Sequence, residues 1–422
     1  MEAKLNPLFE TAVAEKRVPG IGATVVDRTG NLFYHQTFGT KNVNNMNDDD
    51  AASNFDADTI VPVFSVTKLF TSIAALQLIE QGKLALDDLV ETYVPRIAEI
   101  QVLVRCSDDG EPAVLRKAKS KPTILDLLTH TAGFTYDSFD EPTMRWKQRA
   151  GIPEATYYVR GEWTDFATPY TADPGTRYTY GINTDYLGFV VEAVSKLRLP
   201  EYIHKYILEP LDIHHRTGPY SSEEEKKKNM LAIHIKQDDQ NLVAYPGLHL
   251  AESPPHWGGG GFLHTTMNDL AKLLSTILNY GTTSPDHPDR QILQPATIQR
   301  YLFTDCLKAA ADKTRLGEFD DSASPSMTNA ATLLPTCNRR GFSCGLLMNL
   351  EPLPFGRSAG SGMWCGAGNS YYWIDPVADR AGLVITNLYP FLDESVLRLF
   401  DQLERATYGH ELGEDQANYA MR

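Results

Sequence analysis

The sequence predicts an α/β fold in which an antiparallel sheet is built from both ends of the chain and flanked by helices. Three observations predict it: strand pairs lie near both termini, each pair is accompanied by a helical segment, and the middle of the chain has mainly helical spacing interrupted by Pro and Gly. Of the 422 residues, 42% are hydrophobic and 22% charged, which is globular composition. We therefore expect a mainly helical subdomain inserted into a sheet domain.

The N-terminal part is expected to contribute one helix and two strands. Residues 6–17 have amphipathic helical spacing, and Pro19 and Gly20 end it. Residues 21–26 and 32–38 are apolar and β-rich, with a Gly/Asn turn between them, which predicts a hairpin.

The C-terminal part repeats this arrangement in reverse order. Residues 370–375 and 381–387 form a second predicted strand pair, and residues 394–407 a helix. We expect a single unit over residues 1–422. Whether its loop region forms a lid is a question that the sequence leaves open. Its predicted parts are a sheet subdomain (about 1–64 and 340–410), a helical subdomain (about 66–278) and a variable loop region (279–340).

Charge and composition exclude several classes of protein. With 39 Lys+Arg against 54 Asp+Glu, the net charge is −15, which argues against nucleic-acid binding. The chain has no apolar stretch of membrane-spanning length, and its first residues lack the order of a secretory signal, so we expect a cytoplasmic protein without a membrane partner. The five cysteines are scattered, and His214-His215 has no ligand partner at a typical spacing, so no metal or cofactor is expected.

Ser65-Val-Thr-Lys68 is the first candidate for chemistry. It opens a segment of helical spacing, so Lys68 lies one turn after Ser65 on the same face. A serine hydroxyl becomes a good nucleophile when a nearby base takes its proton, and a buried lysine has a lowered pKa suited to this task. Taken alone, the motif is better explained by a helix-capping serine and an exposed lysine.

A rival nucleophile is Ser358 in Gly356-Arg-Ser-Ala-Gly360, which matches the elbow of α/β-hydrolases. That elbow needs a strand before it and a helix after it. A Pro-rich stretch precedes this segment and a strand pattern follows it, so a Gly/Ser loop is the favoured interpretation.

Five short segments follow one another along the chain: Ser65-Val-Thr-Lys68, Leu127-Leu-Thr-His-Thr-Ala-Gly133, Pro174-Gly-Thr-Arg-Tyr-Thr-Tyr180, Gly258-Gly-Gly-Gly261 and Trp364-Cys-Gly-Ala367. Together they resemble the serine β-lactamase-like superfamily. Within it, the chain is most similar to class C β-lactamases, related esterases and above all the fungal lovastatin side-chain acyltransferase (transesterase) type, from about Leu8 to Thr407. The resemblance implies the β-lactamase/transpeptidase-like fold.

The resemblance implies roles for individual residues. Ser65 matches the acylated nucleophile, Lys68 its base partner, and Tyr180 the tyrosine that shuttles protons to and from the leaving group. The backbone N–H groups of Ser65 and Ala367 would form the oxyanion hole, and Gly366 would let the substrate approach the strand closely.

The third motif departs from the family pattern, because Trp364 stands where Lys or His is usual. Its indole would form an apolar wall for an acyl chain or aromatic polyketide, which puts β-lactam hydrolysis in doubt. Tyr178 and Trp257 are further candidates for lining the pocket, although core packing explains them equally well. His130 is expected to be part of the scaffold.

The resemblance implies an acyl-transferring serine enzyme that acts through a Ser65 acyl-enzyme. The expected partners are an ester or thioester donor, with an acyl carrier protein among the candidates, and an alcohol acceptor, in polyketide-like secondary metabolism. An esterase, lactonase or amide hydrolase would use the same residues, so transfer and hydrolysis both stay open. A catalytically silent binding protein is a third alternative, and intact Ser65, Lys68 and Tyr180 count against it.

Overall fold

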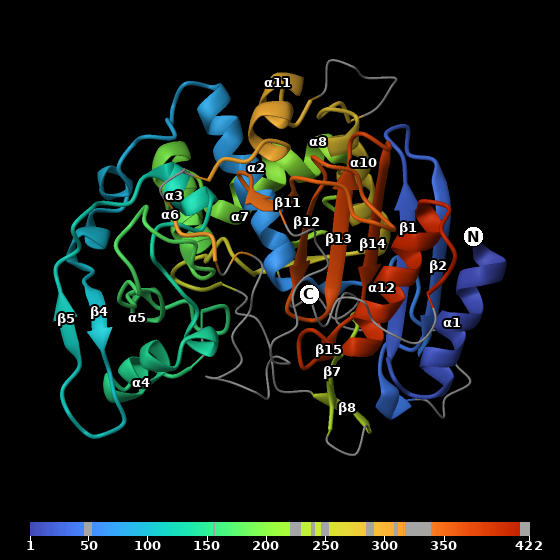
Figure 1. The fold of residues 1–422 in the computed structure, drawn as a ribbon, viewed down its shortest axis with the longest axis horizontal. Coiled ribbons are helices and arrows are strands. Elements are labelled where there is room, and N and C mark those ends of the chain that lie inside the picture. Colours follow the sequence, from blue (N-terminus) through green and yellow to red (C-terminus); the bar gives the residue numbers. More distant parts are fainter. Residues whose placement is uncertain are drawn as a thin grey trace.

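A computed structural model describes residues 1–45, 53–154, 157–219, 229–237, 241–245, 253–283, 291–307, 311–314, 316 and 339–413. Within them, a seven-stranded antiparallel sheet has the strand order β10-β11-β12-β13-β14-β1-β2. The first two strands of the chain therefore pair beside the last strands of the sheet (Figure 1). This arrangement confirms the predicted fold class.

The terminal elements lie close to their predicted bounds. Helix α1 starts earlier than expected, because Leu5 extends the buried stripe of Phe9 and Ala12 by one turn. The bounds are α1 Glu2–Ala14, β1 Gly20–Val26, β2 Leu32–Gly39, β10 Arg340–Phe342, β11 Leu347–Asn349, β12 Gly362–Gly366, β13 Ser370–Asp375, β14 Arg380–Ile385 and α12 Glu394–Thr407.

Helices cover both faces of the sheet. Helices α1 and α12 pack together on one face, and α10 (Met267–Leu278) packs against β1 and β14 on the other (Figure 1). Strands β13 and β14 are buried almost throughout, as expected for strands covered on both sides.

The inserted region is less purely helical than predicted. Several strands of two to four residues occur in it, too short to produce a readable alternation in sequence. Its other described elements are β3 Val61–Pro62, α2 Thr67–Glu80, β4 Val102–Arg105, β5 Val114–Arg116, α3 Ile124–Leu128, α4 Glu141–Arg149, α5 Trp163–Phe166, α6 Asn183–Ser195, α7 Leu199–Ile203, α8 Glu209–Leu211, β6 Gly218–Pro219, β7 Ile233–Lys236, β8 Leu242–Tyr245 and β9 Leu263–Thr265.

Two later segments complete the fold. Helix α11 (Pro295–Thr297) lies in the predicted loop region, most of which is outside the described residues, and β15 (Leu388–Tyr389) pairs with β7. Residues 356–360, the rival elbow, form a loop between β11 and β12; no strand runs directly into it and a strand, not a helix, follows it, as the loop interpretation expected. No helix among the described residues combines the length and apolar character that a bilayer crossing requires.

Candidate active site

Ser65 lies in a tight turn between β3 and α2. The expected helix start is a 3₁₀ turn, Phe64–Val66, and the α-helix proper begins at Thr67. Phe64 has a φ of 43°, in the left-handed region that non-glycine residues rarely adopt. This turn leaves Ser65 only partly buried, whereas the side chains on either side of it are buried.

The structure brings the three predicted catalytic side chains together. Lys68 Nζ lies 2.9 Å from Ser65 Oγ, and the phenol oxygen of Tyr180 lies 2.7 Å from the same Oγ. Tyr180 comes from the loop before α6, and Ser65 and Lys68 from the start of α2; these two helices pack against each other. The packing of α2 on α6 therefore sets the geometry of the three groups.

Burial tunes the charge of Lys68. Its side chain is 2% exposed, and desolvation lowers the pKa of Lys68 from 10.5 to about 8, although the nearby Asp185 carboxylate raises it. The ammonium has three acceptors for its three N–H groups: Ser65 Oγ at 2.9 Å, the Tyr136 hydroxyl at 3.0 Å and the Gly260 carbonyl at 2.9 Å. Lys68 is thus held by both charge and geometry.

Burial acts on Tyr180 in the opposite direction. Desolvation raises the pKa of the Tyr180 phenol, while hydrogen bonds with Ser65 and with the Trp364 side chain lower it. The phenol is therefore neutral in the free enzyme and donates its proton to Ser65 Oγ.

The end of β12 lies against the Ser65 turn. A Cβ added at Gly366 would come within 2.3 Å of the Val63 carbonyl oxygen, so only glycine permits this approach. This contact is a further reason for glycine at position 366, and the close approach of a substrate there stays a prediction. Ala367 is partly buried and packs beside Phe64, so its N–H stays a predicted oxyanion donor.

The predicted pocket-lining residues lie deeper than expected. Trp364 is 1% exposed. Its ring stacks on that of His130 with centroids 6.2 Å apart and meets the Tyr180 ring at 5.1 Å, so it packs against Tyr180 instead of forming an open wall. Tyr178 is 2% exposed and packs against Phe342, and Trp257 is 7% exposed. All three side chains are buried, and their role in lining the substrate pocket stays a prediction.

The sequence interpretation missed a polar cluster behind Lys68. Asp185 Oδ2 accepts hydrogen bonds from the hydroxyls of Tyr136 at 3.2 Å and Tyr158 at 3.4 Å, and Oδ1 accepts from the Gly260 N–H at 3.1 Å. The sequence signal for this cluster is the Gly258–Gly261 run, because consecutive glycines indicate a close approach of the backbone to other groups. A Cβ at Gly260 would come within 2.7 Å of oxygen atoms on all three of these side chains.

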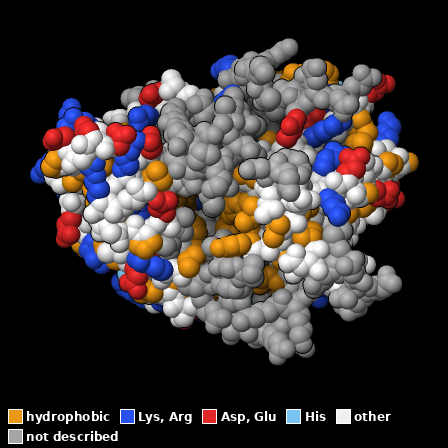
Figure 2. Space-filling view, turned by 90° about the horizontal axis from the view of Figure 1, so that it is seen from below, with side chains coloured by type: hydrophobic (Ala, Val, Ile, Leu, Met, Phe, Trp, Pro, Cys, Tyr) orange, Lys and Arg blue, Asp and Glu red, His pale blue; other side chains and the backbone are white. Residues whose placement is uncertain are grey.

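An apolar cluster includes Phe64, the residue directly before Ser65. Phe64, Ile233 and Tyr389 form a buried group apart from the main core, and we call it the apolar rim. Phe64 and Tyr389 meet edge to face with ring centroids 6.0 Å apart. Seen from the side of β7 and β15, hydrophobic side chains gather in a hollow of the surface (Figure 2).

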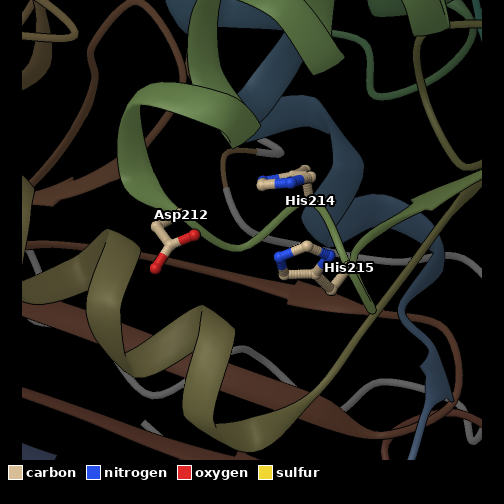
Figure 3. Close-up of side chains that lie close together, drawn as sticks. All are labelled: Asp212, His214 and His215. Atoms are coloured by element: carbon tan, nitrogen blue, oxygen red, sulfur yellow. The ribbon is translucent and has the colours of Figure 1, made fainter.

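Potential metal ligands lie elsewhere. In the turn after α8, Asp212, His214 and His215 have ligand atoms within 4.8 Å of one another (Figure 3). Asp212 and His215 are exposed and His214 is partly buried. Within the part of the chain that the structure describes, these three residues have no contact with Ser65, Lys68 or Tyr180, so the site chemistry does not involve them.

Comparison with known proteins assigns the family. The Beta-lactamase family model matches residues 5–404, and the chain belongs to this family. The match confirms the resemblance found in the sequence.

Individual relatives refine this assignment. Monacolin J acid methylbutanoyltransferase from Aspergillus terreus is 29% identical over 411 residues, covering 96% of this chain and 95% of that protein. Simvastatin synthase (LovD) from the same fungus superimposes with a TM-score of 0.79 at 26% identity, covering 96% and 97% of the two chains. Lovastatin esterase from Penicillium rubens is 30% identical over 210 residues, half of this chain and 51% of that protein. The chain is an acyl-transferring enzyme of the β-lactamase-like type, similar to fungal enzymes of secondary metabolism.

Proposed function

We propose that this protein is a serine acyltransferase that moves an acyl group from an ester or thioester to an alcohol through a Ser65 acyl-enzyme. The observation that carries the proposal is the position of Ser65 Oγ, 2.9 Å from Lys68 Nζ and 2.7 Å from the Tyr180 hydroxyl. This geometry gives the nucleophile one proton acceptor and one proton donor at the same time.

The first step forms the acyl-enzyme. With a pKa of about 8, Lys68 is neutral in roughly one molecule in ten at pH 7. Neutral Lys68 takes the Ser65 proton as Oγ attacks the donor carbonyl, and the N–H groups of Ser65 and Ala367 stabilise the oxyanion. Tyr180 gives its proton to the departing alcohol or thiol, leaving a phenolate beside the Lys68 ammonium.

The second step restores the enzyme. The Tyr180 phenolate takes the proton of the acceptor alcohol, whose oxygen attacks the acyl-enzyme, and the Lys68 ammonium returns a proton to Ser65 Oγ. Both residues end neutral, so the protons balance over the cycle. The raised pKa of Tyr180 makes its phenolate a strong base for the acceptor hydroxyl.

The substrates follow from the relatives and the rim. One relative is named as a methylbutanoyltransferase acting on monacolin J acid, and the apolar rim beside Ser65 is suited to a short aliphatic acyl group. We propose a short branched or linear acyl donor, carried as a small thioester or on an acyl carrier protein, and a polyketide-like alcohol as acceptor. Hydrolysis is the second candidate, because a relative is named as an esterase.

Intact-mass spectrometry tests the proposal. The enzyme is mixed with a p-nitrophenyl ester of a short acid, and an increase of one acyl group is expected in wild type and Ser358→Ala but not in Ser65→Ala. Adding a panel of alcohols then separates the two candidates by the ratio of new ester to free acid. Absence of any adduct with all esters and thioesters would refute the enzyme mechanism.

A further inference from the structure

We propose that Asp185 is a positioning residue that holds Lys68 in place and supplies its counter-charge through the Tyr136 hydroxyl and the Gly260 backbone. This inference rests on the proposed function, because it assigns a residue to the same proton transfer. It adds a group that touches neither Ser65 nor Tyr180.

The first argument is connectivity. Lys68 Nζ donates to the Tyr136 hydroxyl at 3.0 Å and to the Gly260 carbonyl at 2.9 Å. Asp185 accepts from the same two residues, from the Tyr136 hydroxyl at 3.2 Å and from the Gly260 N–H at 3.1 Å. Two of the three acceptors that surround the ammonium are thus fixed by one carboxylate.

The second argument is space. A Cβ at Gly258 would come within 2.4 Å of Asp185 Oδ1, and one at Gly260 within 2.7 Å of Asp185 Oδ2. The glycine run therefore lets the backbone pass directly over the carboxylate, a close approach that any other residue would prevent. Tyr158 completes the cluster, with its hydroxyl 2.7 Å from that of Tyr136.

The third argument is charge. Asp185 is fully buried, and an ionised carboxylate in such a place needs hydrogen-bond donors and a nearby cation. Desolvation raises the pKa of Asp185, whereas Lys68, the Gly260 N–H and the two phenols lower it. Three donors and a buried ammonium favour the ionised form.

The other groups around Lys68 are uncharged across the neutral pH range. Burial raises the pKa of the tyrosines and of the Cys365 thiol, and burial together with Lys68 lowers the pKa of His130 well below 6.5. The titratable groups that face Lys68 are Asp185 from α6, His130 and Tyr136 from the segment after α3, Tyr158 and Tyr180 from loops, and Cys365 from β12.

The charge of Asp185 sets the direction in which its removal should shift the pKa of Lys68. A negative charge near Lys68 favours the ammonium and raises the pKa of Lys68, so removing it lowers that pKa further. Neutral Lys68 is the form that accepts the Ser65 proton, so the acylation rate rises with pH up to about 8 in wild type. In Asp185→Asn this rising limb is expected at lower pH.

The test is single-turnover acylation by p-nitrophenyl butyrate from pH 5.5 to 9.5, quenched and read by intact mass. For Asp185→Asn we expect the rising limb to move to lower pH and the plateau rate to fall by up to about 100-fold, the effect of a misplaced catalytic group. Tyr136→Phe, which keeps the charge but removes one link, is expected to lower the plateau by about 10-fold or more and to move the limb in the same direction.

A second buried carboxylate provides matched controls. Asp375 accepts from the Tyr408 hydroxyl at 3.0 Å and from the Ser358 N–H at 2.7 Å, on a distant part of the sheet. Asp375→Asn removes a comparable buried carboxylate and Tyr408→Phe a partly buried hydroxyl that donates to it, and both should keep the wild-type pH profile.

The outcomes separate the two proposals. A wild-type adduct on Ser65 with unmoved limbs in Asp185→Asn and Tyr136→Phe overturns the inference and leaves the proposed function intact. A loss of rate without a shift of the limb would also overturn it, because that is the result of a merely structural residue. Absence of a Ser65 adduct in wild type at every pH overturns the proposed function and this inference with it.

Discussion

Two segments of this chain combine a serine with a buried cation, and they use the charge in different ways. In the Ser65 segment, Lys68 Nζ donates to the serine hydroxyl, and its counter-charge Asp185 is reached through a phenol and a backbone group. In the Ser358 segment, Arg357 Nε donates directly to Glu404 Oε1 at 3.0 Å, with the side chains 0% and 1% exposed. The direct pair fastens the loop to α12.

The difference shows why Lys68 suits the proton transfer that we propose for it. A directly paired guanidinium stays charged, and its value is structural. A lysine separated from its carboxylate has a pKa lowered to about 8, so it exchanges a proton near neutral pH. Both serines match sequence motifs, and the surroundings of the neighbouring cation are one feature that distinguishes them, beside the Tyr180 hydroxyl that contacts Ser65.

The largest expected effect comes from removing the catalytic cation. Lys68→Met keeps the aliphatic stem but removes both the proton acceptor for Ser65 and the charge that stabilises the Tyr180 phenolate. We expect the single-turnover acylation rate to fall by about 10⁴-fold, the upper end for a lost general base. Intact-mass kinetics with a short p-nitrophenyl ester measures it, and a rate within 10-fold of wild type would contradict the role of Lys68.

Removing the structural cation, Arg357, should lower stability and leave the acylation rate nearly unchanged. Arg357→Met removes the guanidinium that pairs with the buried Glu404 carboxylate, which costs about 3–5 kcal/mol in the free energy of unfolding. Urea unfolding followed by fluorescence measures this loss. The acylation rate of the folded protein should stay within about twofold of wild type; a large fall in that rate with unchanged stability would reverse the roles of the two segments.

Much of the fold was predictable because its signals are local. The strands near both termini and helix α12 lie at or close to their predicted residues, since apolar runs, turn residues and helical spacing define them along the chain. The short strands of the inserted region were missed. A strand of two residues, such as β3, exists because β9 lies beside it, and that contact joins residues about 200 positions apart.

The residues of the site show the same difference between local signals and contacts of distant residues. Ser65, Lys68 and Tyr180 belong to short motifs, and the family resemblance was enough to predict them. Asp185 and Tyr136 act through contacts between a helix and a distant loop, and no local pattern distinguishes a buried aspartate that orients a lysine from an ordinary one. The burial of Trp364 was missed for the same reason, because its exposure depends on His130 from another part of the chain.

The smallest expected effect concerns this tryptophan, which stands where the family usually has a cation. The Trp364 indole donates toward the Tyr180 phenol and lowers the pKa of Tyr180, and their rings lie 5.1 Å apart. Trp364→Phe removes the donor while keeping an aromatic ring, so the phenolate should form less readily in the first step, when Tyr180 gives up its proton. A hydrogen bond to a charged group contributes about 1.5–3 kcal/mol, so we expect a fall in rate of roughly 10- to 100-fold.

The fall should appear in acylation and not in transfer to an alcohol, because the Tyr180 phenolate forms in the first step of the proposed cycle and acts as the base in the second. Stopped-flow measurement of each step checks it, with Tyr178→Phe as the control, because it also removes a polar group from a buried aromatic residue that packs on His130. A variant that lost only binding of the acyl donor, with unchanged maximal rates, would instead return Trp364 to the substrate wall that the sequence predicted. The neutral indole would then have replaced the family's cation for the shape of the pocket, and the tuning of Tyr180 would depend on Ser65 and burial alone.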